Sequence, residues 1–121
     1  MKKILIVDDQ LEVRELVDVT LRSGDFQVFH AENGEEAIQV ARAEKPELII
    51  MDVMMPGAVD GLEATRILKN DPETKEIAII MLTARGQGED IKLGVEAGAK
   101  DYFVKPFSPL ELIKKVEEIL G

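Results

Sequence analysis

Hydrophobic residues along the chain form five short runs, separated by longer segments in which apolar positions recur at helical spacing. The runs are residues 4–7, 26–30, 48–53, 77–82 and 102–104. The first, third and fourth are almost continuously apolar, which is typical of parallel strands buried on both faces. The second and fifth are shorter and more mixed, so we expect them at the edges of a sheet.

The segments between the runs carry signals for helix starts. In four of them a side-chain acceptor precedes a glutamate by three positions, a pattern that predicts a capped helix N-terminus. The pairs are Asp9/Glu12, Asn33/Glu36, Asp60/Glu63 and Ser108/Glu111. Five strand–helix units in succession predict an α/β fold with a parallel sheet, right-handed crossovers and helices on both faces. We expect a single domain over residues 1–121.

Composition removes several classes of function. The chain has no cysteine, which excludes a disulfide framework, a thiolate zinc site and a catalytic cysteine. Its formal charge of −9, with no basic stripe, argues against direct contact with nucleic acid. No apolar stretch approaches the length of a membrane span, and the N-terminus lacks the features of a signal peptide. We therefore expect a cytoplasmic protein with no membrane contact.

Polar residues stand where the predicted strands end. Asp8 and Asp9 follow the first strand, Asp52 the third, Thr83 the fourth and Lys105 the fifth. Ligands of open parallel sheets bind at the carboxyl ends of the strands, so we expect these side chains to meet there.

Three carboxylates within about 4 Å of one another repel by several kcal/mol each at an effective dielectric constant near 20, so the cluster needs a cation. An all-oxygen ligand set without histidine or cysteine favours a hard ion, and shared phosphate oxygens favour Mg²⁺. Lys105 would add a second positive charge for those oxygens.

Each of these residues alone has an ordinary explanation. Asp8 and Asp9 could be a helix cap and a solvated acid, Thr83 a strand residue, and Lys105 a surface charge. Asp52 is harder to explain in this way, because aspartate is unfavourable in strands and a lone buried carboxylate is costly. The combination at four strand ends favours a functional site.

Four segments of the chain resemble receiver domains of bacterial two-component systems, of the chemotaxis-regulator type. They are ILIVDD (4–9), MDVMMPG (51–57), LTA (82–84) and YFVKPF (102–107), and the resemblance extends over nearly the whole chain. It implies a flavodoxin-like, doubly wound (βα)5 fold whose five-stranded parallel sheet has the order 2-1-3-4-5.

The same resemblance implies roles for the acidic residues. Asp52 would be the phosphoacceptor. Asp9 and Asp52 would bind Mg²⁺ directly, Asp8 through a water molecule, and Met54 through its backbone carbonyl.

Further roles follow for the remaining positions. Thr83 and Lys105 would bind phosphoryl oxygens, Tyr102 would change rotamer, and the Lys105–Pro106 bond would be cis.

The phosphoryl donor would be a sensor histidine kinase or a phosphotransfer protein. Phosphorylation would remodel the face of the fourth helix, fifth strand and fifth helix, which would contact an output domain or protein and is a candidate for dimerisation. Slow self-dephosphorylation would end the signal, so the domain is a switch rather than an enzyme.

The chain departs from the family at one place. After the predicted phosphoacceptor the family usually has Pro-Gly-Met-Asp-Gly, whereas residues 56–61 read PGAVDG and are one residue longer. We expect this difference to change the loop before the third helix and to leave the acidic pocket intact.

Three alternatives remain open at this point. The domain could pass phosphate onward in a phosphorelay without switching a surface. It could be a phosphatase with an aspartate nucleophile, although Met54 stands where those enzymes have a second acid. It could bind flavin or a nucleotide, although acids replace the hydroxyl- and glycine-rich loop that such a function needs after the first strand.

Overall fold

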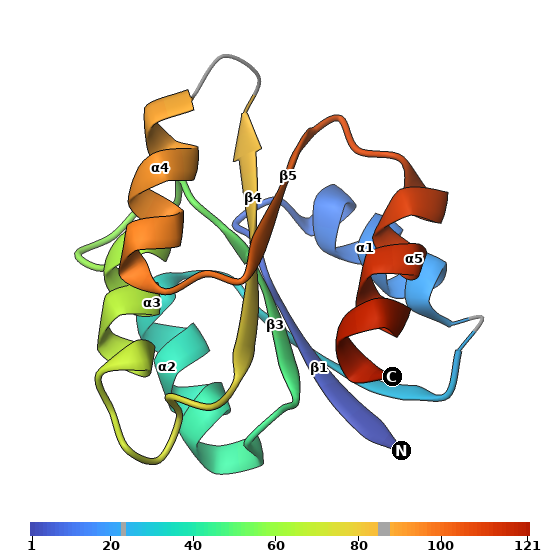
Figure 1. Cartoon of the computed structure of the whole chain (residues 1–121), viewed down its shortest axis with the longest axis horizontal. Helices are drawn as coiled ribbons and strands as arrows, with labels where there is room; N and C mark the ends of the chain where they lie inside the picture. Colours follow the sequence, from blue (N-terminus) through green and yellow to red (C-terminus); the bar gives the residue numbers. More distant parts are fainter. Residues whose placement is uncertain (23, 85–87) are drawn as a thin grey trace.

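A computed structural model describes residues 1–22, 24–84 and 88–121, and its strands form one parallel sheet (Figure 1). The elements are β1 (Lys2–Val7), α1 (Leu11–Leu21), β2 (Phe26–Ala31), α2 (Gly34–Glu44), β3 (Leu48–Asp52), α3 (Gly61–Lys69), β4 (Ala78–Ala84), α4 (Gly88–Ala97), β5 (Asp101–Lys105) and α5 (Pro109–Leu120). The strand order is β2-β1-β3-β4-β5. The predicted flavodoxin-like fold and the edge positions of β2 and β5 are thus confirmed.

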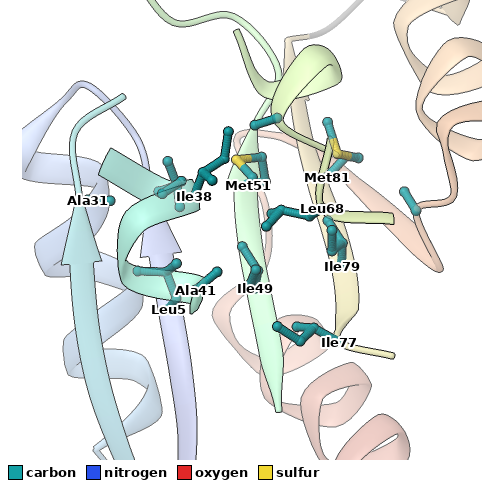
Figure 2. Close-up of a cluster of buried hydrophobic side chains, with 14 of the residues drawn as sticks. Leu5, Ala31, Ile38, Ala41, Ile49, Met51, Leu68, Ile77, Ile79 and Met81 are labelled. Carbon is teal, nitrogen blue, oxygen red and sulfur yellow. The ribbon is translucent and has the colours of Figure 1, made fainter. Parts of the chain in front are cut away.

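The helices cover both faces of the sheet, with α2, α3 and α4 on one side and α1 and α5 on the other (Figure 1). Successive side chains of a strand point to opposite faces. Leu5 and Ile49 therefore enter the core under α2 and α3 (Figure 2), whereas Ile6 and Ile50 enter the core under α1 and α5. All four are fully buried, which explains the continuous apolar runs of β1 and β3.

Three of the four predicted helix caps are present. The side chains of Asn33, Asp60 and Ser108 accept hydrogen bonds from the backbone N–H three residues later, at 2.8, 2.9 and 3.4 Å. Each bond satisfies one of the N–H groups that the first turn of a helix leaves without a partner.

The cap predicted at Asp9 is wrong. The N-cap of α1 is Gln10, and its side chain makes no capping hydrogen bond. The chain leaves β1 through an Asx-type turn instead, in which Oδ1 of Asp8 accepts from the Gln10 N–H at 2.9 Å. The helix consequently begins one residue later than expected, and the Asp9 carboxylate is not used as a cap.

All five strands are parallel, so their carboxyl ends share the edge of the sheet toward which the β4 arrow points in Figure 1. No helix in the described part of the chain is long and apolar enough to cross a membrane.

Candidate functional site

Three aspartates meet at the carboxyl ends of the strands. Asp8 and Asp9 follow β1, and Asp52 ends the adjacent strand β3. One carboxylate oxygen from each lies within 4.8 Å of the others. Asp8 is fully buried and Asp52 is 5 % exposed, whereas Asp9 is exposed. The sequence-predicted acids are therefore brought together, two in the protein interior and one at its surface.

Lys105 reaches this cluster from β5, although β4 lies between β5 and β3 in the sheet. Its Nζ lies 2.8 Å from Oδ2 of Asp8 and 3.3 Å from Oδ1 of Asp52. The following Lys105–Pro106 peptide bond is cis. One ammonium group is thus shared by two largely buried carboxylates.

The charges in the cluster are not balanced. Burial, and next the negative charge of Asp8, raise the pKa of Asp52 to about 6, despite the opposing effect of Lys105. Burial alone would lower the pKa of Lys105, but the hydrogen bond to Asp8 and the charge of Asp52 outweigh it and raise that pKa. The pocket therefore holds excess negative charge and favours a further cation.

Thr83 adds a hydroxyl from β4. It is the penultimate residue of this strand, which runs two residues beyond the predicted end, and its side chain is 1 % exposed. Within the described part of the chain its Oγ1 is buried and has no hydrogen-bond partner. An unpaired buried hydroxyl costs about 1–3 kcal/mol, so it is an unusual feature of a strand whose role is only structural.

The pocket is open to solvent beside the buried acids. A hollow of about 200 Å³ is lined by Asp9, Gln10, Asp52, Met54 and Lys105. The Met54 side chain is 64 % exposed, so it does not seal the hollow. The site can therefore admit a ligand of the size of a phosphoryl group.

The chain matches a known protein family over nearly its whole length. The response regulator receiver domain model matches residues 4–117. The phosphate regulon transcriptional regulatory protein PhoB of Pseudomonas aeruginosa is 44% identical over 119 residues, which is 98% of this chain and 52% of that protein. The chain belongs to the response regulator receiver domains. It spans about half the length of the curated relatives it matches.

Solved structures of receiver proteins resemble the whole fold. A Chloroflexus aurantiacus protein assigned as a response regulator superposes with a TM-score of 0.93 and 41% identity, covering 98% of this chain and 97% of that one. The chemotaxis response regulator CheY4 of Vibrio cholerae gives 0.89 and 34%, with 98% of both chains covered. This chain is thus a receiver domain of the two-component response regulators.

The residues of the acidic cluster fit the Mg²⁺ ion that receiver domains usually bind. Three carboxylates with no histidine or cysteine form the donor set that hard cations prefer. Burial first, and next the negative charge of Asp8, raise the pKa of Asp52, and such an ion would offset both effects by favouring the ionised carboxylate.

Tyr102 lies on the edge strand β5 and is 42 % exposed. Its register partner on β4 is Met81, and Val104 is the partner of Thr83. The predicted switch residues thus stand on neighbouring strands, with the tyrosine directed outward. A glycine at position 86 predicts a loose connection between β4 and α4, but Gly86 lies outside the described residues.

The sequence interpretation missed Arg14. This residue of α1 is 7 % exposed, and its Nη1 donates to the backbone oxygen of Asp8 at 2.6 Å. A signal was available, because Arg14 precedes Val17 by three and Leu21 by seven positions, which places it on the buried stripe of the helix. It supports the turn that carries Asp8 and Asp9.

Gly61 explains how α3 can begin beside the site. A Cβ at this position would lie 2.0 Å from the backbone oxygen of Asp52, closer than any side chain tolerates. The Gly61 N–H donates to the Val53 oxygen at 3.0 Å. The loop of residues 53–60 is therefore closed at its base, directly after the central aspartate.

Proposed function

We propose that this receiver domain accepts a phosphoryl group on Asp52 from the phosphohistidine of a sensor histidine kinase or a phosphotransfer protein. The observation that carries the proposal is the position of Asp52, largely buried, beside Asp8 and 3.3 Å from the Lys105 ammonium. Asp8 is also buried beside Lys105 and two acids, but its Oδ1 already accepts from the Gln10 N–H and it does not line the hollow, whereas Asp52 does.

In the transfer step a carboxylate oxygen of Asp52 attacks phosphorus. The phosphorus–nitrogen bond of the donor breaks, and its electron pair remains on the departing imidazole. The ammonium of Lys105 and the hydroxyl of Thr83 bind phosphoryl oxygens. The Thr83 hydroxyl is available for this because it has no hydrogen-bond partner among the described residues. Catalysis of this kind rests on positioning and charge neutralisation.

Mg²⁺ would neutralise charge on the phosphoryl oxygens and on Asp52 when bound. Asp9 and Asp52 would hold it directly, Asp8 through a water molecule and Met54 through its backbone carbonyl. Asp9 is the exposed member of the cluster and borders the hollow, which suits a ligand that a cation meets first. Water would later attack phosphorus, release inorganic phosphate and restore the Asp52 carboxylate.

Phosphorylation would then alter the face formed by α4, β5 and α5. If the Thr83 hydroxyl moves toward a phosphoryl oxygen, it vacates space that the exposed Tyr102 ring can enter. An output domain or protein would read this face, and the relatives PhoB and ResD are named as transcriptional regulatory proteins. We place this activity in a cytoplasmic domain over residues 1–121, without direct nucleic-acid or membrane contact.

The test uses acetyl phosphate as a small donor. Intact-mass spectrometry should detect one added phosphoryl group on the wild type with Mg²⁺, and none with EDTA or in Asp52→Asn. Asp60→Asn is the matched control, because it makes the same change at the end of the same loop and retains a capping side chain. Persistent labelling of Asp52→Asn would refute the assignment. Turnover of a phosphomonoester would favour the phosphatase alternative.

A further inference from the structure

The loop of residues 53–60 joins β3 to α3 and is one residue longer than the family pattern. Its base is fixed by two backbone hydrogen bonds, from Val53 N–H to the Leu82 oxygen and from Gly61 N–H to the Val53 oxygen, both at 3.0 Å. These two hydrogen bonds anchor only the ends of the loop, and the residues between them, including Met54, are not tied to the sheet by them. The tip of the loop therefore needs another support.

That support comes from α2. The Val59 N–H donates to Oε1 of Glu35, the second residue of this helix, at 3.0 Å. Gly57 adopts a φ of +104°, and a Cβ built there would lie 3.6 and 3.7 Å from the two carboxylate oxygens of Glu35. The loop backbone thus passes over the carboxylate at two positions.

Gly34 makes this approach possible. A Cβ at Gly34 would lie 2.3 Å from the backbone oxygen of Val59 and 2.7 Å from its Cγ1. Any side chain at the first residue of α2 would consequently push the loop away. Gly34 and Glu35 together hold the tip of the loop against α2. Gly34 leaves space for the Val59 backbone, and Glu35 accepts a hydrogen bond from it.

We infer that Glu35 is a positioning residue for the metal site, acting through the loop on the backbone carbonyl of Met54. The inference rests on the proposed function, which assigns that carbonyl to Mg²⁺. Met54 stands two residues after Asp52, between the fixed base of the loop and the tip held by Glu35. The hydrogen bond from Val59 to Glu35 of α2 restricts the conformations of the longer loop, and it therefore restricts the direction of the Met54 carbonyl.

Glu36 provides a control on the same helical turn. Its carboxylate accepts from the Glu32 N–H at 2.8 Å and makes no described contact with the loop. Replacing Glu36 therefore removes the same charge from the same region, but it leaves the contacts of the loop with Gly34 and Glu35 intact. Glu35→Gln subtracts the charge too, but retains an oxygen that can accept from Val59.

The experiment measures the Mg²⁺ dissociation constant by isothermal titration calorimetry and the metal-free melting temperature. Substitutions that displace the supports of metal ligands typically weaken metal binding by 10–100-fold. Glu35 is exposed and acts through backbone, so we expect a smaller effect, about three- to fivefold in Glu35→Ala. Glu35→Gln and Glu36→Ala should stay within about twofold of the wild type. Gly34→Ala should weaken binding as Glu35→Ala does.

Amide hydrogen exchange supplies a second readout in the absence of metal. Exchange at Val59 should be faster in Glu35→Ala than in Glu36→Ala, because only the first substitution removes the acceptor. Equal Mg²⁺ dissociation constants for these two variants would overturn the inference alone. If the wild type binds no Mg²⁺, the proposed function fails and the inference fails with it.

Discussion

The ammonium nitrogen of Lys105 lies 2.8 Å from Oδ2 of Asp8, a carboxylate with no exposed surface. The same nitrogen lies 3.3 Å from Asp52, while Asp9 completes the cluster from the surface. The cluster therefore contains three carboxylates and one ammonium group, which contacts only Asp8 and Asp52.

The first prediction concerns the stability of the metal-free protein. The folded state raises the pKa of Asp52 from 3.8 to about 6, so it binds a proton more tightly than the unfolded chain does. Ionised Asp52 consequently destabilises the fold above pH 6, and stability rises as the pH falls from about 6 to about 4. At pH 7.5, Asp52→Asn should raise the free energy of unfolding by about 1–3 kcal/mol.

Urea denaturation in EDTA at several pH values measures this effect. The advantage of Asp52→Asn should shrink as the pH falls and approach zero near pH 4, whereas Asp60→Asn, which keeps a capping side chain, should give no comparable gain at pH 7.5. A variant that is no more stable than the wild type at pH 7.5, or whose advantage is independent of pH, would contradict the explanation.

The second prediction concerns Asp9. Replacing it with asparagine removes one repulsive charge and should stabilise the metal-free protein, but by less than Asp52→Asn does, because Asp9 is exposed and its charge is screened by solvent. The same substitution should abolish the stabilisation that Mg²⁺ provides by binding only the folded state. Thermal melts with and without Mg²⁺ measure both effects, with Glu12→Gln, in the first turn of α1, as the control. Strong stabilisation of Asp9→Asn by Mg²⁺ would be incompatible with a direct ligand role.

The third prediction concerns the link between Thr83 and Tyr102. Beryllofluoride with Mg²⁺ mimics an acyl phosphate, and NMR spectra of this complex should differ from the Mg²⁺-only form at α4 and at Tyr102. These differences should disappear in Thr83→Ala and persist in Thr83→Ser, which keeps the hydroxyl. Because a ligand shifts an equilibrium only by its differential affinity for two states, the change can be partial.

Changes confined to residues around Asp52 would contradict a surface switch. They would support the alternative in which this domain passes phosphate onward in a relay.

The elements of the fold could be predicted from local patterns. Burial on both faces requires apolar residues at successive positions, so β1, β3 and β4 are visible as continuous runs. A cap such as Asn33 bonds a backbone group three residues away, so its signal lies within one turn of sequence. The order of polar residues at strand ends also follows from the chain, because parallel strands place their carboxyl ends together.

Tertiary structure alone decided how those polar residues share charge. Lys105 and Asp8 are 97 residues apart, and their contact depends on how β5 packs beside the rest of the sheet. The same is true of Glu35 and Val59, which meet only because α2 and the longer loop are packed together. Desolvation and distances between remote residues set these outcomes, and neither is encoded in a short stretch of chain.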